Sequence, residues 1–154
     1  MDWKIRLATP GDVKSLVDFN CGIARETENK ELDRELVTRG VARAFQQGED
    51  VAYYVAHLAD ELIGSLMLTR EWSDWRDGWL IWIQSVYVAE EHRGKGVFSA
   101  MYAEVKRLAS SDATACGIRL YVERDNSTAQ ATYQKLGMIE TDYRIMEEEF
   151  PAGD

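Results

Sequence analysis

A chain of 154 residues with 45% hydrophobic content is long enough for one buried core and too short for two, so we expect a single domain over residues 1–154. The 18 basic and 27 acidic residues give a net charge of −9, which argues against nucleic acid as a partner and favours cationic or neutral substrates such as amines. The chain has neither an apolar run near the ~20 residues that span a bilayer nor an apolar signal region, so we expect a cytoplasmic protein that binds no membrane.

The chain has two cysteines and two histidines, few for a disulfide framework or a metal site. Cys21 and Cys116 are far apart in the sequence, and no cluster of histidines accompanies them. The sequence therefore predicts neither a disulfide framework nor a metal site, and we expect two reduced thiols.

The first half of the chain begins with a predicted strand and two predicted helices. Apolar residues alternate over residues 3–8, as in a strand, and Thr9-Pro10-Gly11-Asp12 is typical of a helix N-terminus. The apolar residues within residues 21–30 recur with no clear helical or strand periodicity, so we expect a loop there, helical at most at its start. A second helix is expected from about Asp33 to Gln47.

A hairpin with an aromatic connection is predicted next. Residues 51–57 and 62–69 are strand-like and are joined by a short polar turn. The connection over residues 70–78 is longer than a tight hairpin needs, and it carries Trp72 and Trp75. These tryptophans either form a binding surface or fold back onto their own sheet, and both interpretations stay open.

The stretch over residues 79–108 reads as strand, loop and helix. Residues 79–88 are rich in β-branched and aromatic residues, as in a buried strand, and Arg93-Gly94-Lys95-Gly96 precedes a run with helical apolar spacing from Val97 to Leu108. The glycines therefore lie at a helix N-terminus, where free backbone N–H groups and the helix dipole attract anions. Arg93 and Lys95 add full positive charges, so we expect a polyphosphate ligand.

The residues of this loop leave another interpretation open, namely a tight turn with two solvated cations. Two other phosphate-binding loops fit poorly. A Walker-type loop needs a hydroxyl residue where this chain has Gly96, and a dinucleotide fingerprint needs a third glycine where it has Ser99.

The last third of the chain predicts a strand, a helix and a closing strand. Residues 117–122 alternate as in a strand. Asp125-Asn126-Ser127 is a capping signal for a helix that Gly137 ends. We expect one or two closing strands within residues 139–150.

Two stretches, residues 84–102 and 125–138, resemble motifs of the GNAT superfamily of N-acetyltransferases. Val86-Tyr87-Val88 and Arg93 to Gly96 resemble the strand and the Arg/Gln-x-x-Gly-x-Gly/Ala loop of that family, although Phe98 stands in the sixth place. The second stretch shares the residues of an Asn-x-x-Ala-x-x-x-Tyr-x-Lys-x-Gly pattern: Asn126, Ala129, Tyr133, Lys135 and Gly137. The resemblance implies the α/β GNAT fold of acyl-CoA N-acyltransferases, with a mixed, mostly antiparallel central sheet flanked by helices.

The resemblance also implies an acetyl-CoA co-substrate, without a metal, and transfer of its acetyl group to a primary amine by direct attack on the thioester. In the family the fourth and fifth strands diverge, and the pantetheine arm lies between them. The acceptor would be a small-molecule amine or a peptide amine. The residues implied to bind acetyl-CoA are Val86, Tyr87, Val88, Arg93, Gly94, Lys95, Gly96, Val97, Phe98 and Asn126.

The catalytic residues implied by the resemblance include a general acid and lack a clear base. Tyr133 would protonate the departing sulfur. Gln84 stands where family members often have a glutamate, and an amide orients a water but takes no proton. The candidate carboxylates for the acceptor side are Glu26 and Glu28, in the predicted loop, and Glu71, Asp74 and Asp77 on the hairpin.

Two alternatives to an acetyltransferase remain at the level of sequence. The first is a sensor module of the same fold that binds acyl-CoA without turnover, which the missing base keeps open. The second is an unrelated nucleotide-binding protein, which leaves the Tyr133 stretch unexplained. The sequence names neither the amine nor the oligomeric state, and a homodimer is left open.

Overall fold

The computed structural model describes residues 2–151, which fall into two compact units. One unit ends at Tyr121 and the other begins at Val122. The expectation of a single domain over the whole chain stays a prediction. Over the described residues, no helix is both long and apolar enough to cross a membrane.

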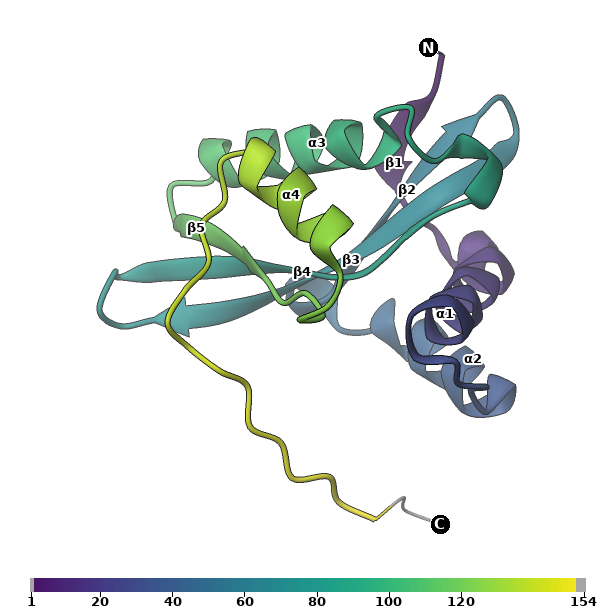
Figure 1. Ribbon diagram of the computed structural model, residues 1–154, viewed down its shortest axis with the longest axis horizontal. Helices are drawn as coiled ribbons and strands as arrows, with labels where there is room; N and C mark the ends of the chain where they lie inside the picture. The colour runs from purple at the N-terminus through teal and green to yellow at the C-terminus, as the bar shows by residue number, and fades with distance from the viewer. Residues whose placement is uncertain (1, 152–154) are drawn as a thin grey trace. The chain divides into compact units, whose positions relative to one another are not determined.

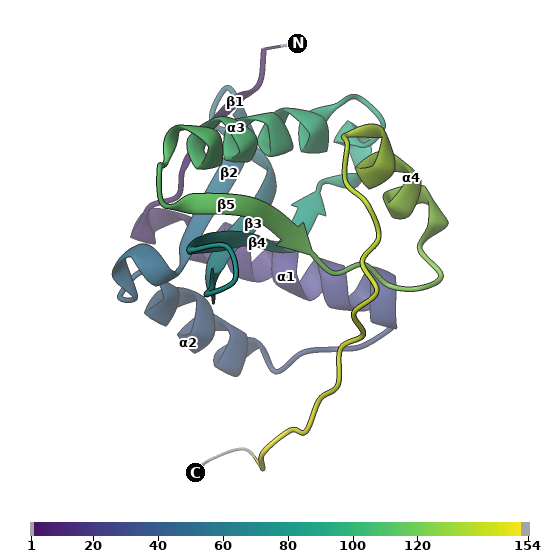
Figure 2. The same ribbon diagram turned by 90° about the vertical axis from the view of Figure 1, so that its left-hand side faces the viewer.

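The first unit is a sheet with helices on both faces. Among residues 2–151 the sheet has five strands in the order β1-β2-β3-β4-β5, antiparallel except for the parallel pair of β4 and β5. Helix α3 lies on one face, and α1 and α2 lie on the other (Figures 1 and 2). The elements are β1 (Lys4–Leu7), α1 (Val13–Glu28), α2 (Arg34–Ala44), β2 (Ala52–Leu58), β3 (Glu61–Ser73), β4 (Gly78–Val88), α3 (Val97–Ser111) and β5 (Ala115–Leu120). This mixed, mostly antiparallel sheet confirms the fold class expected from the sequence.

The core of the first unit fills both faces of the sheet. On the α1 side, Leu16 and Val17 pack with Val55 of β2, and all three are buried. On the α3 side the approach is close at Gly64, where a Cβ would lie 2.9 Å from the Tyr87 carbonyl oxygen and 3.4 Å from the Met101 side chain. Gly64 therefore permits α3 and β4 to approach β3, and the helices hold the loop that precedes α3 against the end of β4.

Helix α1 is longer than the sequence predicted. The expected loop over residues 21–30 is wrong, because the helix continues to Glu28 and ends at Asn29, whose φ of 49° is a left-handed cap. The buried side of this second half is made of small residues, including Gly22 and Ala24. Such residues give no apolar stripe in the sequence. Glu26 and Glu28 consequently lie on a helix.

The hairpin of β3 and β4 is tighter than predicted. The expected long connection over residues 70–78 is wrong, because β3 continues to Ser73, which pairs with Gly78. Within the hairpin Trp72 packs edge-on against Trp79, with ring centroids 4.9 Å apart. Trp72 therefore folds back onto its own sheet, whereas Trp75 in the turn is 86% exposed.

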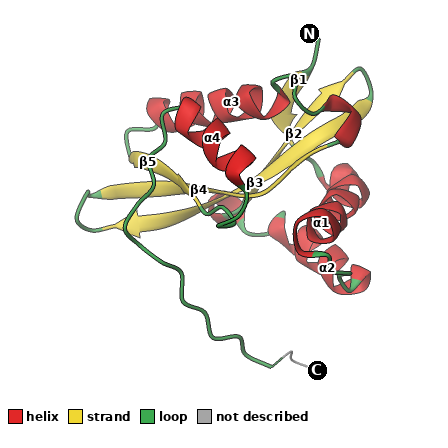
Figure 3. Ribbon diagram, in the orientation of Figure 1, coloured by secondary structure: helices red, strands yellow, loops and turns green. Residues whose placement is uncertain are grey.

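The second unit contains helix α4 (Ser127–Lys135). The Asn126 side chain accepts a hydrogen bond from the Ala129 N–H at 3.1 Å, and Gly137, with a φ of 99°, follows the helix as predicted. The predicted closing strands are wrong, since none occurs in residues 139–151 of the described chain (Figure 3). Alternating residues such as Tyr143 and Ile145 are exposed there, because a strand also requires a hydrogen-bonding partner, which alternation does not provide.

Asp12 stabilises the junction between β1 and α1. Its carboxylate accepts hydrogen bonds from Arg6 at 2.8 and 3.1 Å and from the Thr9 N–H at 2.8 Å. The hydrogen bonds from Arg6 outweigh burial and hold the pKa of Asp12 below its usual value. A carboxylate with a lowered pKa stabilises the fold at pH values above its ordinary pKa, and this stability is lost as the pH falls through the folded-state pKa.

We expect Asp12→Asn to lower the free energy of unfolding at neutral pH by about 1 kcal/mol, because it weakens an N-terminal cap and a partly buried ion pair. Urea denaturation at a series of pH values measures this. The difference from the wild type should shrink as the pH falls below about 4 and through the lowered folded-state pKa of Asp12, because the wild-type carboxylate becomes protonated over that range. Asp60→Asn, in the exposed turn between β2 and β3, is the control and should have little effect. A difference that persists unchanged at low pH would refute the assignment to charge.

Candidate active site

The second half of β4 is paired on one side. β4 pairs with β3 along its length, but its parallel pairing with β5 ends at Ile83 and Leu120. Beyond that point β4 continues to Val88, while β5 ends at Leu120. The edge of β4 at Val86 and Val88 therefore has no pairing with β5, and backbone groups on this edge could pair with a ligand instead.

A bulge at Ser85 sets which side chains of β4 face α1. Ser65 pairs with Tyr87 and Met67 pairs with Gln84, so two residues of β4 lie opposite one of β3, and Ser85 has a φ of 52°. Met67 packs against the α1 core, so Gln84, its partner, shares that face. Because of the bulge Tyr87 also faces α1.

The glycine loop has the geometry of an anion site. Gly94 has a φ of 74°, and Gly96, the N-cap of α3, has a φ of 93°. A Cβ built on either glycine would have no described protein atom within 4 Å, so the space above both is open. The free N–H groups of the first turn of α3 lie beside this space, as the sequence predicted. Lys95 is exposed between the two glycines.

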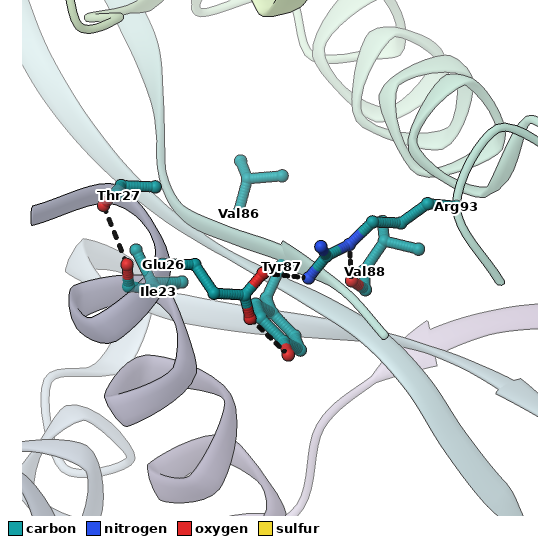
Figure 4. Close-up of a pocket in the computed structure, with 7 residues that line it drawn as sticks. All are labelled: Ile23, Glu26, Thr27, Val86, Tyr87, Val88 and Arg93. Atoms are coloured by element: carbon teal, nitrogen blue, oxygen red, sulfur yellow. Dashed lines mark hydrogen bonds and ion pairs between the residues drawn. The ribbon is translucent and has the colours of Figure 1, made fainter. Parts of the chain in front are cut away.

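Arg93 points back along β4 toward α1 (Figure 4). Its Nε donates to the Val88 carbonyl oxygen at 2.8 Å, and its Nη2 lies 2.6 Å from Glu26 Oε1. The other carboxylate oxygen of Glu26 accepts a hydrogen bond from the Tyr87 hydroxyl at 2.9 Å. These residues line a pocket of about 290 Å³ together with Ile23, Thr27 and Val86.

The contacts of Glu26 decide its protonation state. Burial alone would raise the pKa of Glu26. The hydrogen bonds from Tyr87 and Arg93 together lower it by more than burial raises it, so the pKa of Glu26 lies below its usual value. Burial and the Glu26 carboxylate together raise the pKa of Tyr87. Glu26 is therefore ionised at neutral pH and already accepts from two donors, which makes it a weak base.

The other candidates on the acceptor side differ in their surroundings. The Gln84 amide donates to Thr69 Oγ1 on β3, which leaves its carbonyl oxygen to accept from a ligand or water. Glu28 is exposed at the end of α1. Glu71 accepts from Trp82 Nε1 at 3.0 Å and pairs with Arg119 at 3.1 Å, whereas Asp74 and Asp77 are exposed in the hairpin turn.

Sequence reasoning missed both of these carboxylate networks. The Glu26–Arg93–Tyr87 group joins α1, β4 and the glycine loop, and the Glu71–Trp82–Arg119 group joins three strands. Both depend on contacts between distant segments. Residue types and spacing contain no signal for such contacts.

Tyr133 and Asn126 belong to the second unit. Tyr133 is half-buried on α4, and burial raises its pKa. Its hydroxyl is therefore protonated at neutral pH and is able to donate a hydrogen bond or a proton. The oxygen of the Asn126 side chain caps α4, as described above.

A cluster of three potential metal ligands lies outside these sites. Glu61, Glu91 and His92 each offer a ligand atom, and these atoms lie within 4.8 Å of one another. Both glutamates are exposed, and exposed acidic groups are common without a metal. The absence of a metal site stays a prediction.

Comparison with known proteins supports the fold and shows the family. The profile of the acetyltransferase (GNAT) family matches residues 16–138, which include most of α1, the glycine loop and α4. The chain belongs to the GNAT acetyltransferase family. A crystal structure described as a possible acetyltransferase from Clostridium difficile is 41% identical, with a TM-score of 0.89 over 97% of this chain and 99% of that chain.

Two further comparisons are a partial sequence match and a structural match. Streptothricin acetyltransferase from Escherichia coli is 36% identical over 89 residues, which are 58% of this chain and 48% of that protein. The match thus spans about half the length of this relative. A predicted acetyltransferase from Clostridium acetobutylicum, solved with acetyl-CoA, is 17% identical with a TM-score of 0.76 over 95% of this chain and 96% of that chain, and this likeness shows the fold alone.

Proposed function

We propose that this GNAT protein transfers the acetyl group of acetyl-CoA to a primary amine. The observation that carries the proposal is the glycine loop, whose positive φ angles and open Cβ positions create a cradle at the N-terminus of α3. A diphosphate fits such a cradle, because free backbone N–H groups and the helix dipole both favour anions. The remaining acetyl-CoA contacts that we propose are backbone contacts at Val86 and Val88, with Asn126 on the pantetheine side.

The reaction that we propose is a direct transfer. The nitrogen of a neutral amine attacks the thioester carbonyl carbon, the C–N bond forms, and the C–S bond breaks. Tyr133 is the proposed general acid: its hydroxyl is protonated at neutral pH, and its proton moves to the departing sulfur. The amine loses one proton in the same process.

The proton of the amine needs an acceptor other than Gln84 or Glu26. Gln84 takes no proton, and Glu26 is held by two donors. We propose that a water oriented by the Gln84 carbonyl oxygen carries the proton to an exposed carboxylate, Glu28 or a residue of the hairpin turn. A carboxylate in direct contact with an ammonium would raise the pKa of the amine and oppose attack, so a relay through water suits this chemistry better.

Net charge and one partial relative support the proposed acceptor class. A net charge of −9 attracts cationic amines. The partial match to a streptothricin acetyltransferase makes an amino antibiotic one member of the panel to be tested, beside polyamines and peptides with a free N-terminus or a lysine.

The test is release of CoA thiol from acetyl-CoA in the presence of this amine panel, with the acetylated product identified by mass spectrometry. We expect thiol release to depend on the amine. A protein that binds acetyl-CoA but releases no thiol with any amine would instead be the sensor module, which the absence of a carboxylate at Gln84 favours. A protein that fails to bind acetyl-CoA would refute both functions.

A further inference from the structure

The side chain of Arg93 does not point into the cradle above the glycines. Its Nε bonds to the carbonyl of Val88, and its Nη2 pairs with Glu26 on α1, as Figure 4 shows. The guanidinium carbon also lies 5.4 Å from the centre of the Tyr87 ring. The charge of Arg93 is thus largely balanced by Glu26, at the end of β4, before any ligand binds.

The position of Glu26 is not explained by the helix that contains it. Glu26 lies in the last turn of α1, where the negative end of the helix dipole disfavours a carboxylate. What holds it there is a pair of donors from outside the helix, the Tyr87 hydroxyl and the Arg93 guanidinium. Charge-assisted hydrogen bonds of this kind are among the stronger polar contacts in proteins.

The packing around Tyr87 makes the connection between α1 and β4 rigid. Tyr87 stacks on Phe19 with ring centroids 5.1 Å apart, and a Cβ on Gly22 would lie 3.1 Å from its ring and hydroxyl. Gly22 therefore lets the helix come close enough for Glu26 to reach Tyr87 and Arg93. The result is a clamp, which we define as Glu26, Tyr87 and Arg93.

We propose that Glu26 and Arg93 are positioning residues. They clamp the second half of β4, which pairs with β3 only, to α1, and they thereby fix the strand edge that receives the pantetheine arm. This inference rests on the proposed function. In this arrangement the fixed charge at the diphosphate comes from Lys95 and the backbone of the cradle, whereas Arg93 acts through Val88. Loss of the clamp then weakens CoA through its pantetheine part.

The experiment measures binding of two ligands by calorimetry: CoA, and 3′-phospho-ADP, which has the diphosphate but no pantetheine. We expect Glu26→Gln to weaken CoA about tenfold and 3′-phospho-ADP less than about twofold, because only the strand edge is affected. Arg93→Met should show the same selectivity, and the double variant should be no weaker than Arg93→Met alone, because the two residues act as a unit. Lys95→Gln should weaken both ligands.

Asp18→Asn is the matched control. Asp18 is also on α1, also accepts from two side chains, and is 44% exposed compared with 41% for Glu26, but its partners Lys14 and Arg34 belong to α1 and α2, and neither comes from β4 or the glycine loop. We expect this variant to bind both ligands as the wild type does. An equal loss of CoA affinity in Asp18→Asn and Glu26→Gln would show general destabilisation, and equal losses of both ligands in Glu26→Gln would place its effect at the diphosphate. Either outcome overturns the proposal.

A second measurement separates the clamp from the proposed function. In the ligand-free protein the Tm losses of Glu26→Gln and Arg93→Met should not add in the double variant, because each breaks the same contact. Additive losses would overturn the clamp itself. If instead the wild type binds no CoA, the proposed function fails and the positioning role fails with it, while non-additive Tm values would still show that the clamp exists.

Discussion

Replacing Tyr133 with phenylalanine is expected to lower the turnover number for acetyl transfer about 10²-fold while CoA affinity changes little. The hydroxyl meets negative charge that develops on the sulfur only as the C–S bond breaks, so its loss affects the transition state more than the ground state. Burial keeps this hydroxyl protonated at neutral pH, which is the state that the role requires. Steady-state kinetics with the best amine, together with calorimetry for CoA, measure the two quantities.

The control for Tyr133→Phe lies in the same protein. Tyr143→Phe removes a hydroxyl from a side chain that is 70% exposed in the same unit, and we expect its turnover number to equal that of the wild type. If Tyr133→Phe has normal turnover but a lower Tm, Tyr133 is a packing residue of α4. A different group must then protonate the sulfur.

Replacing Gly94 with aspartate is expected to weaken CoA on the order of 10²-fold. Two unit charges 4 Å apart near a protein surface repel by about 4 kcal/mol, and screening by solvent and salt reduces this to a smaller but still large effect. Asparagine and aspartate tolerate the left-handed backbone that a φ of 74° requires, so both variants should fold. Gly94→Asn, of nearly the same shape without the charge, should weaken CoA less than about tenfold.

Gly48→Asp is the matched control for backbone strain. Gly48 has a φ of 62°, and a Cβ there also meets no described atom within 4 Å, but it precedes β2, away from the glycine loop. We expect its stability to fall as in Gly94→Asp and its CoA affinity to remain normal. Equal affinities of Gly94→Asp and Gly94→Asn for CoA would show that no anion lies at this loop.

Local signals in the sequence predicted most of the fold. Gly94 and Gly96 between a strand and a helical stripe placed the N-terminus of α3, and Asn126 and Gly137 placed both ends of α4. In each case a few neighbouring residues determine the backbone, because caps and tight turns depend on local chemistry. The same reasoning placed β1 and the cap at Thr9.

The errors occurred where the structure depends on residues distant in the sequence. The second half of α1 is helical and packs against Tyr87. Gly22 permits this contact because it has no side chain, but in the sequence a glycine at this position suggests the end of a helix. The length of β3 follows from pairing with β4 as far as Ser73. The contacts of the acceptor-side carboxylates were missed for the same reason, because Glu26 and Glu71 pair with arginines that are distant in the sequence.

The bulge at Ser85 divides β4 into two segments that differ in how far a substitution disturbs the sheet. Before the bulge, from Trp79 to Ile83, a substitution must suit a hydrogen-bonded neighbour on each side. After it, Val86 and Val88 have β3 on one side only, and the extra residue absorbs a change of register locally. A substitution in the last residues of the strand therefore disturbs its pairing with β3 alone, whereas a substitution before the bulge disturbs the pairing with two neighbouring strands.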